Sequence, residues 1–198
     1  MCGERTGGEA GQTGLGGVPM IDAGYFAKRI TPRPDGLHAP GVREICSVSC
    51  CISPGPDDWI GHWRHNEFGW YNTIDDAWSV VPEADRPAYR LFAYRIALTR
   101  FRKGEALEVP VPADVHPAPI PADFASLGYD AVSRSTGSGF SFECSPLSCN
   151  MMAGEIPANE NCLLDTEAAA TAAAKAFSAG KVEPGDYYVV EVLEARRT

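Results

Sequence analysis

The segment that most constrains the fold is a long run of alternating residues at 89–101, which reads YRLFAYRIALTRF. Aromatic and apolar side chains occupy both of its alternating sets, which is typical of a central β-strand buried on both faces. The segment 187–193, YYVVEVL, has the same character. A strand of this length needs hydrogen-bonded neighbours on either side. The other expected strands are 25–30, 45–52, 129–133, 140–144 and 162–164.

Helices are expected to be fewer than strands. The clearest lies in the segment DTEAAATAAAKAFSAG, where Asp165 is an N-cap, alanines fill the body and Gly180 follows the last turn. Shorter helices are expected at 74–81 and 57–65. Because strands outnumber helices and do not alternate strictly with them, the sequence predicts an α+β fold. We expect a single domain with a mixed or largely antiparallel sheet, two or three short helices and one Ala-rich C-terminal helix.

Glycine and proline divide the chain into parts. Seven of the first 17 residues are glycine and no apolar run accompanies them, so residues 1–19 are expected to form a flexible tail. Five prolines in residues 109–121 predict an extended, polyproline-like strap. We therefore expect residues 20–198 to form one domain, with this strap crossing its surface.

The charge of the chain restricts its partners. The formal net charge of −9 argues against a duplex nucleic-acid partner, because a protein that binds duplexes needs a concentrated basic face. No apolar run approaches the roughly 18 residues of a membrane helix, and no export signal is recognisable, so a cytoplasmic protein is expected. Between residues 104 and 194 there are 14 acidic and three basic residues. This acidic part indicates a non-catalytic protein-interaction or regulatory role with a basic protein partner, or a face that keeps the protein in solution.

All four tryptophans lie within 20 residues, in a segment that also carries two histidines. A helix at 57–65 would place two tryptophans on one face and His62 with His65 on another. One interpretation is an aromatic pocket for a planar, nucleotide-like ligand; the other is a small aromatic core. The pocket residues would be Trp59, Trp63, Trp70, Tyr71 and Trp78.

The segment RSTGSGFSFE, at 134–143, combines flexible glycines with hydroxyl groups and two charges. Arg134, the Ser-Thr step and Glu143 resemble the Arg, Ser-Thr-Ser and Glu pattern of some ADP-ribosyltransferases, although Gly137 stands where the second serine would be. The resemblance covers about ten residues. It implies an enzyme acting on a nucleotide-like substrate, and the other interpretation of the segment is a hairpin loop. The candidate catalytic residues are His62, His65, Arg134 and Glu143.

Two cysteine- and serine-rich patches resemble each other: CSVSCC at 46–51 and CSPLSC at 144–149. A structural zinc site would use Cys46, Cys50, Cys144 and Cys149 as ligands. If 45–52 is a strand, however, Cys46 and Cys50 lie about 13 Å apart, whereas thiolates on one zinc lie about 4 Å apart. The sequence therefore favours buried, reduced cysteines that only pack, and it leaves the cofactor unknown.

Overall fold

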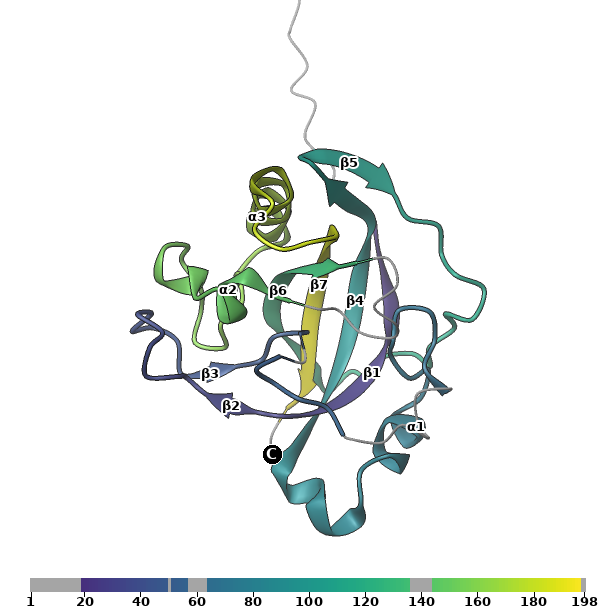
Figure 1. Ribbon diagram of the computed structural model, residues 1–198. Helices are drawn as coiled ribbons and strands as arrows, with labels where there is room; N and C mark the ends of the chain where they lie inside the picture. The colour runs from purple at the N-terminus through teal and green to yellow at the C-terminus, as the bar shows by residue number, and fades with distance from the viewer. Residues whose placement is uncertain (1–18, 50, 57–63, 136–143, 197–198) are drawn as a thin grey trace, which may run out of the picture.

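The computed structural model describes residues 19–49, 51–56, 64–135 and 144–196. Its main feature is an antiparallel sheet of five strands, which are β1 (Met20–Arg29), β4 (Tyr89–Arg102), β5 (Glu105–Glu108), β6 (Phe124–Arg134) and β7 (Asp186–Ala195). The strands lie in the order β1-β4-β7-β6, and β5 pairs with the far end of β4 (Figure 1). A second, small sheet pairs β2 (Thr31–Pro32) with β3 (Glu44–Ile45).

The predicted α+β class is confirmed, because an antiparallel sheet is combined with a few separate helices. The helices are short except for the Ala-rich one. The α-helices are α1 (Ile74–Ser79), α2 (Pro146–Cys149) and α3 (Glu167–Gly180), and 3₁₀ turns lie at Glu83–Ala88 and Met152–Gly154. The N-cap of α3 is Thr166 rather than Asp165, and its hydroxyl accepts a hydrogen bond from the Ala169 amide at 3.2 Å. No helix in the described part of the chain is long and apolar enough to span a membrane.

The two central strands are buried on both faces, as the pattern at 89–101 predicts. On one face, side chains of β4 and β7 such as Tyr94 and Val190 pack in a core that also contains Trp70. On the other face, Tyr187 of β7 packs against Phe177 of α3 with ring centroids 5.8 Å apart. The small side chains of α3 let it lie close to the sheet.

The outer strands each contain a glycine bulge that admits a loop to the sheet edge. Gly24 in β1 and Gly128 in β6 have φ values of 140° and 134°, and the pairing register shifts at both. A Cβ atom on Gly128 would lie 2.7 Å from the Leu164 carbonyl oxygen, and one on Gly24 would lie 2.7 Å from that of Tyr71. Immediately beyond these bulges, the backbones of Tyr71 and Leu164 pair with β1 and β6 respectively. Both edges of the sheet are therefore partly covered by loops.

The predicted strand at 45–52 is wrong beyond its first residue. β3 ends at Ile45, and the following backbone turns its carbonyl groups toward the side chain of Lys28, as detailed below. The strand predicted at 162–164 is reduced to one bridge at Leu164. The helix predicted at 57–65 and the strand at 140–144 lie almost entirely outside the described residues.

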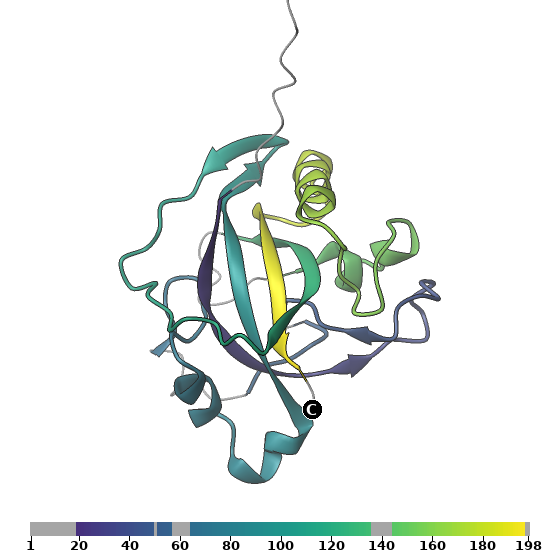
Figure 2. The same cartoon turned by 180° about the vertical axis from the view of Figure 1, so that it is seen from behind.

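The proline-rich segment has neither helix nor strand from 109 to 123. It runs past β1 (Figure 2). There the Tyr25 hydroxyl donates to the carbonyl oxygens of Ala118 at 3.0 Å and Pro119 at 3.1 Å. The Asn72 side-chain amide also donates to the Asp114 carbonyl oxygen at 2.9 Å. Polar contacts thus anchor the segment to β1 and to the loop before α1.

Candidate metal centre

The fold brings the two cysteine patches together. The sulfur atoms of Cys51, Cys144 and Cys149 all lie within 4.8 Å of one another. Cys144 follows β6 and its carbonyl oxygen accepts a hydrogen bond from the Ser133 amide at 2.8 Å, while Cys149 ends α2. Cys144 is buried, Cys149 is half-buried and Cys51 is exposed, so the cluster has a side that opens to solvent.

The loop that leads to Cys51 is shaped by one buried lysine. The Nζ atom of Lys28, on β1, donates to the carbonyl oxygens of Ser47 at 2.7 Å, Val48 at 2.8 Å and Ser49 at 2.6 Å. Three successive carbonyl groups that converge on one ammonium group cannot pair with a neighbouring strand. Lys28 is only 1% exposed, so these bonds replace the hydration that its charge has lost.

One buried carboxylate links the two patches. Asp130, on β6, accepts hydrogen bonds at Oδ2 from the Ser47 hydroxyl at 3.0 Å and the Val48 amide at 2.9 Å. Its Oδ1 accepts from the hydroxyl of Ser145, directly after Cys144, at 2.6 Å. Burial raises the pKa of Asp130, and the hydrogen bonds and the charge of Lys28 oppose that rise. Lys28 therefore holds the first cysteine-bearing loop, and Asp130 joins that loop to the second.

The cysteines of the cluster differ in how readily they ionise. A hydrogen bond from the Cys144 thiol is the largest cause of a lowered pKa at Cys149, and hydroxyl groups also contribute. These belong to Ser49, whose Oγ lies 3.6 Å from the Cys149 sulfur, and Ser148, whose Oγ lies 3.8 Å from it. The same contact with Cys149, followed by burial, raises the pKa of Cys144. Cys149 is therefore the first of this pair to become a thiolate.

The cluster differs from the four ligands predicted from the sequence. Cys46 lies apart from it: its thiol donates to Glu44 Oε1 at 3.6 Å, and burial raises its pKa to about 12. Cys50 lies outside the described residues. Cys51, which the spacing argument left out, lies beside Cys144 and Cys149 instead. The adjacent Cys50 and Cys51 at the end of CSVSCC indicated that a ligand could lie there. The sequence does not determine which of these two side chains faces the second patch.

The aromatic residues predicted to line a pocket are placed in cores where the structure describes them. Trp70 is 4% exposed and packs on Tyr94 with ring centroids 4.7 Å apart. Tyr71 is 2% exposed and stacks on Phe26 at 6.0 Å. Trp78 is half-buried under the guanidinium group of Arg86. Trp59 and Trp63 lie outside the described residues, so the nucleotide pocket stays a prediction.

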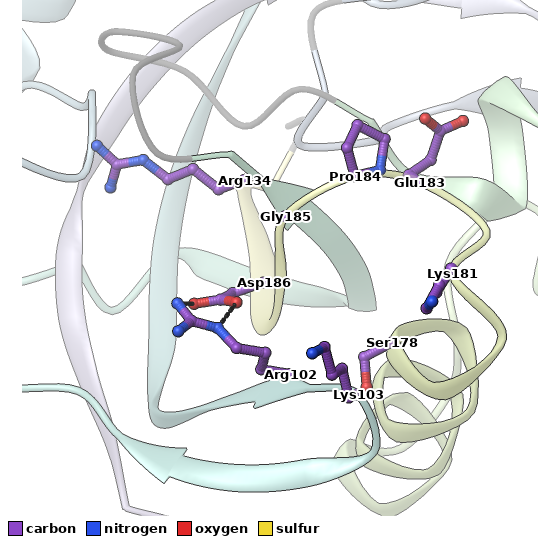
Figure 3. A pocket seen from close by; sticks show the side chains of 9 residues that line it. All are labelled: Arg102, Lys103, Arg134, Ser178, Lys181, Glu183, Pro184, Gly185 and Asp186. Atoms are coloured by element: carbon purple, nitrogen blue, oxygen red, sulfur yellow. Dashed lines mark hydrogen bonds and ion pairs between the residues drawn. The ribbon is translucent and has the colours of Figure 1, made fainter.

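The predicted catalytic residues are only partly described, since His62 and Glu143 lie outside the described residues. The ring of His65 packs edge-on against Tyr71, with centroids 4.2 Å apart. Arg134 lines a separate cavity of about 670 Å³ (Figure 3). Its guanidinium group donates to the Glu67 carbonyl oxygen at 2.7 Å. It thereby touches the loop that carries His65.

The donor set of the cysteine cluster suits a soft or borderline metal ion. Zinc–sulfur bonds of about 2.3 Å place tetrahedral thiolates about 3.8 Å apart, so the three sulfurs need to approach one another by at most about 1 Å. Three thiolates leave a fourth position of a tetrahedral ion for water or another ligand on the solvent side. Comparison of the chain with protein-family models, with curated proteins and with solved structures finds no match.

Proposed function

We propose that this protein binds one zinc ion through the thiolates of Cys51, Cys144 and Cys149. The observation that carries the proposal is the convergence of three thiol groups, from segments about 95 residues apart in sequence, within 4.8 Å of one another. Thiolate sulfur is a preferred ligand of zinc, and three donors exceed what a redox pair of cysteines requires. The zinc alternative, which strand spacing disfavoured, gains support because the 45–52 segment is not a strand.

Hydrogen bonds of the chain itself hold the ligand loops in place. In many small zinc domains the ion supplies the folding energy, since nothing else holds the ligand loops together. Here Asp130 already bonds to Ser47 and Ser145, and Lys28 holds the carbonyl groups of the first loop. The ion is therefore bound by a folded protein, and the exposed side of the cluster at Cys51 leaves it accessible to a fourth ligand.

Elemental analysis of the full chain, purified without chelator and supplied with zinc, tests the proposal. We expect about one equivalent of zinc in the wild-type protein and less than about a fifth of that in Cys149→Ser and Cys51→Ser. Cys46→Ser is the matched control: it also exchanges a cysteine for serine in the first patch, but its sulfur lies outside the cluster.

Two results would overturn the zinc assignment. One is a wild-type protein that retains less than about a fifth of an equivalent after dialysis against metal-free buffer. The other is an equal loss of zinc from Cys46→Ser and Cys149→Ser, which would mean that the metal is bound elsewhere or nonspecifically. Cobalt(II) gives a second readout, because coordination by thiolates produces an intense charge-transfer absorption that the Cys149→Ser variant should lack.

The role as a protein-interaction or regulatory partner for a basic protein stays a prediction from the charge pattern. The same holds for an enzyme that acts on a nucleotide-like substrate. Neither conflicts with zinc binding, and neither is needed for it.

A further inference from the structure

A cavity of about 670 Å³ lies where three connections meet at one end of the sheet, and it does not include the cysteine cluster. It is formed by the turn between β4 and β5, the end of β6 and the connection from α3 to β7 (Figure 3). Its volume is in the range of small-molecule sites. Its charged lining residues are Arg102, Lys103, Arg134, Lys181, Glu183 and Asp186.

The cavity gathers positive charge in an acidic protein. Only three basic residues occur between 104 and 194, and two of them, Arg134 and Lys181, line this cavity. Asp186 is already neutralised: Arg102 donates to both of its oxygens, at 2.6 and 2.7 Å, and Arg100 approaches at 2.8 Å. Two guanidinium groups on one carboxylate leave an excess positive charge beside the cavity.

Two lysines of the lining occupy backbone conformations that favour glycine or asparagine. Lys103 and Lys181 have φ values of 52° and 53°. Lys103 precedes Gly104 in a tight hairpin turn, where asparagine is the usual partner of glycine, and Lys181 takes the left-handed position that ends α3. Within the described residues, neither ammonium group has a hydrogen bond or an ion pair. Glycine would adopt either conformation without the steric cost of a Cβ atom, so the lysine side chains are present at some cost in backbone energy.

The backbone segments that carry the two lysines are held together. The Gly104 amide donates to the hydroxyl of Ser178, on α3, at 2.9 Å, which docks the hairpin turn on the end of the helix. A Cβ atom on Gly104 would lie 3.3 Å from that of Ala179, so the approach is close. In Figure 3, Lys103 and Lys181 lie on either side of Ser178. A cation beside the carbonyl end of α3 is favourable by itself, which accounts for a lysine at position 181. It does not account for Lys103, which lies in the turn between β4 and β5.

We infer that this cavity binds the phosphate group of a small phosphorylated molecule, with Lys103 and Lys181 as its main ligands. Two lysines that have no ion pair in the described part of the chain attract a dianion, and the Arg100–Arg102–Asp186 group adds to the positive potential. No aromatic ring lines the cavity in the described part of the chain, so nothing there stacks on a nucleobase. The inference is independent of the proposed zinc site and does not use the cysteines.

The test is a titration of the full chain with glycerol 3-phosphate and, separately, with inorganic phosphate. Backbone amide NMR chemical shifts, recorded at about 0.15 M salt, monitor the binding. We expect saturable shifts at Lys103, Gly104 and Lys181 with a Kd of about 1 mM or lower, and none with glycerol. In Lys181→Gly, the Kd should rise at least about fivefold. This variant should be as stable as the wild type or more so, because glycine prefers the left-handed position.

Lys175→Ala is the matched control, since it removes one charge from the same helix outside the cavity. Its Kd should stay within about twofold of the wild-type value. The inference is overturned by an absence of localised shifts with either phosphate up to about 10 mM. It is also overturned if Lys175→Ala weakens binding as much as Lys181→Gly, because only the overall charge would then matter.

Discussion

Replacement of Asp130 by alanine should destabilise the protein and weaken zinc binding together. The carboxylate is 0% exposed and accepts three hydrogen bonds, from Ser47, Val48 and Ser145. Hydrogen bonds to a charged group contribute about 1.5–3 kcal/mol each, but bonds in one network are not additive. Loss of one partner from a buried charged network costs about 3–5 kcal/mol, and we expect the free energy of unfolding to fall by this amount.

For a chain of 198 residues, a loss of this size corresponds to a fall in Tm of about 6–20 °C. Thermal unfolding followed by far-ultraviolet circular dichroism measures it. Asp123→Ala is the control, because Asp123 is exposed and carries the same charge; its free energy of unfolding should change by less than about 0.5 kcal/mol. Zinc affinity is then measured by chelator competition, at a temperature where Asp130→Ala is fully folded. We expect a fall of about 10- to 100-fold, since outer partners of ligands have effects of this size.

Two outcomes would refute this reasoning. If Asp130→Ala unfolds at the same temperature as Asp123→Ala, the carboxylate does not hold the loops together. If stability falls but zinc affinity stays within about twofold of wild type, Asp130 supports the core and not the thiol cluster.

Three further results are expected. Gly128→Ala should lower the free energy of unfolding, measured by urea denaturation, by about 2 kcal/mol or more, because its Cβ would lie 2.7 Å from the Leu164 carbonyl oxygen at a φ of 134°. Gly36→Ala is the control: its Cβ would lie 3.5 Å from its nearest neighbour, and the free energy should change by less than about 0.5 kcal/mol. Thr166→Ala should lose about 1 kcal/mol through loss of the α3 N-cap, and Thr166→Ser should recover most of it; equal stability of all three proteins would contradict the cap. Removal of zinc by a chelator should leave the circular dichroism spectrum unchanged while Cys51 becomes open to alkylation, as read by mass spectrometry, and loss of the folded spectrum would show that the ion holds the fold.

The parts of the fold that the sequence predicts are those that local pattern decides. The alternation at 89–101 leads to β4, and the Ala-rich segment leads to α3, because each buries side chains on faces that its own period defines. The strand at 45–52 fails for the opposite reason. Its conformation depends on Lys28, about 20 residues before it, and on Asp130, about 80 residues after it. No property of the segment CSVSCC reveals these partners.

The cysteine cluster shows the same limit at the level of chemistry. The likeness of the two patches suggested a joint site, and the structure places Cys51 of the first patch beside Cys144 and Cys149 of the second. The prediction of Cys46 as a ligand assumed that residues 45–52 form a strand. The separation of about 13 Å between Cys46 and Cys50, which disfavoured zinc, rested on the same assumption. Once the chain bends around Lys28, Cys46 contacts Glu44 and Cys51 reaches the second patch. The order of residues along a loop does not state which side chain a bend turns inward.

The position of Lys28 has a consequence for how the protein can be observed. A primary amine that is 1% exposed and surrounded by three carbonyl oxygens cannot react with an acylating reagent while the protein is folded. Its labelling rate therefore measures how often the interior opens, in the way that amide hydrogen exchange does. Comparison with the exposed Lys175 on the same molecule gives an internal standard for the reagent. Acylation of Lys28 thus reports the opening rate of the loop that leads to Cys51.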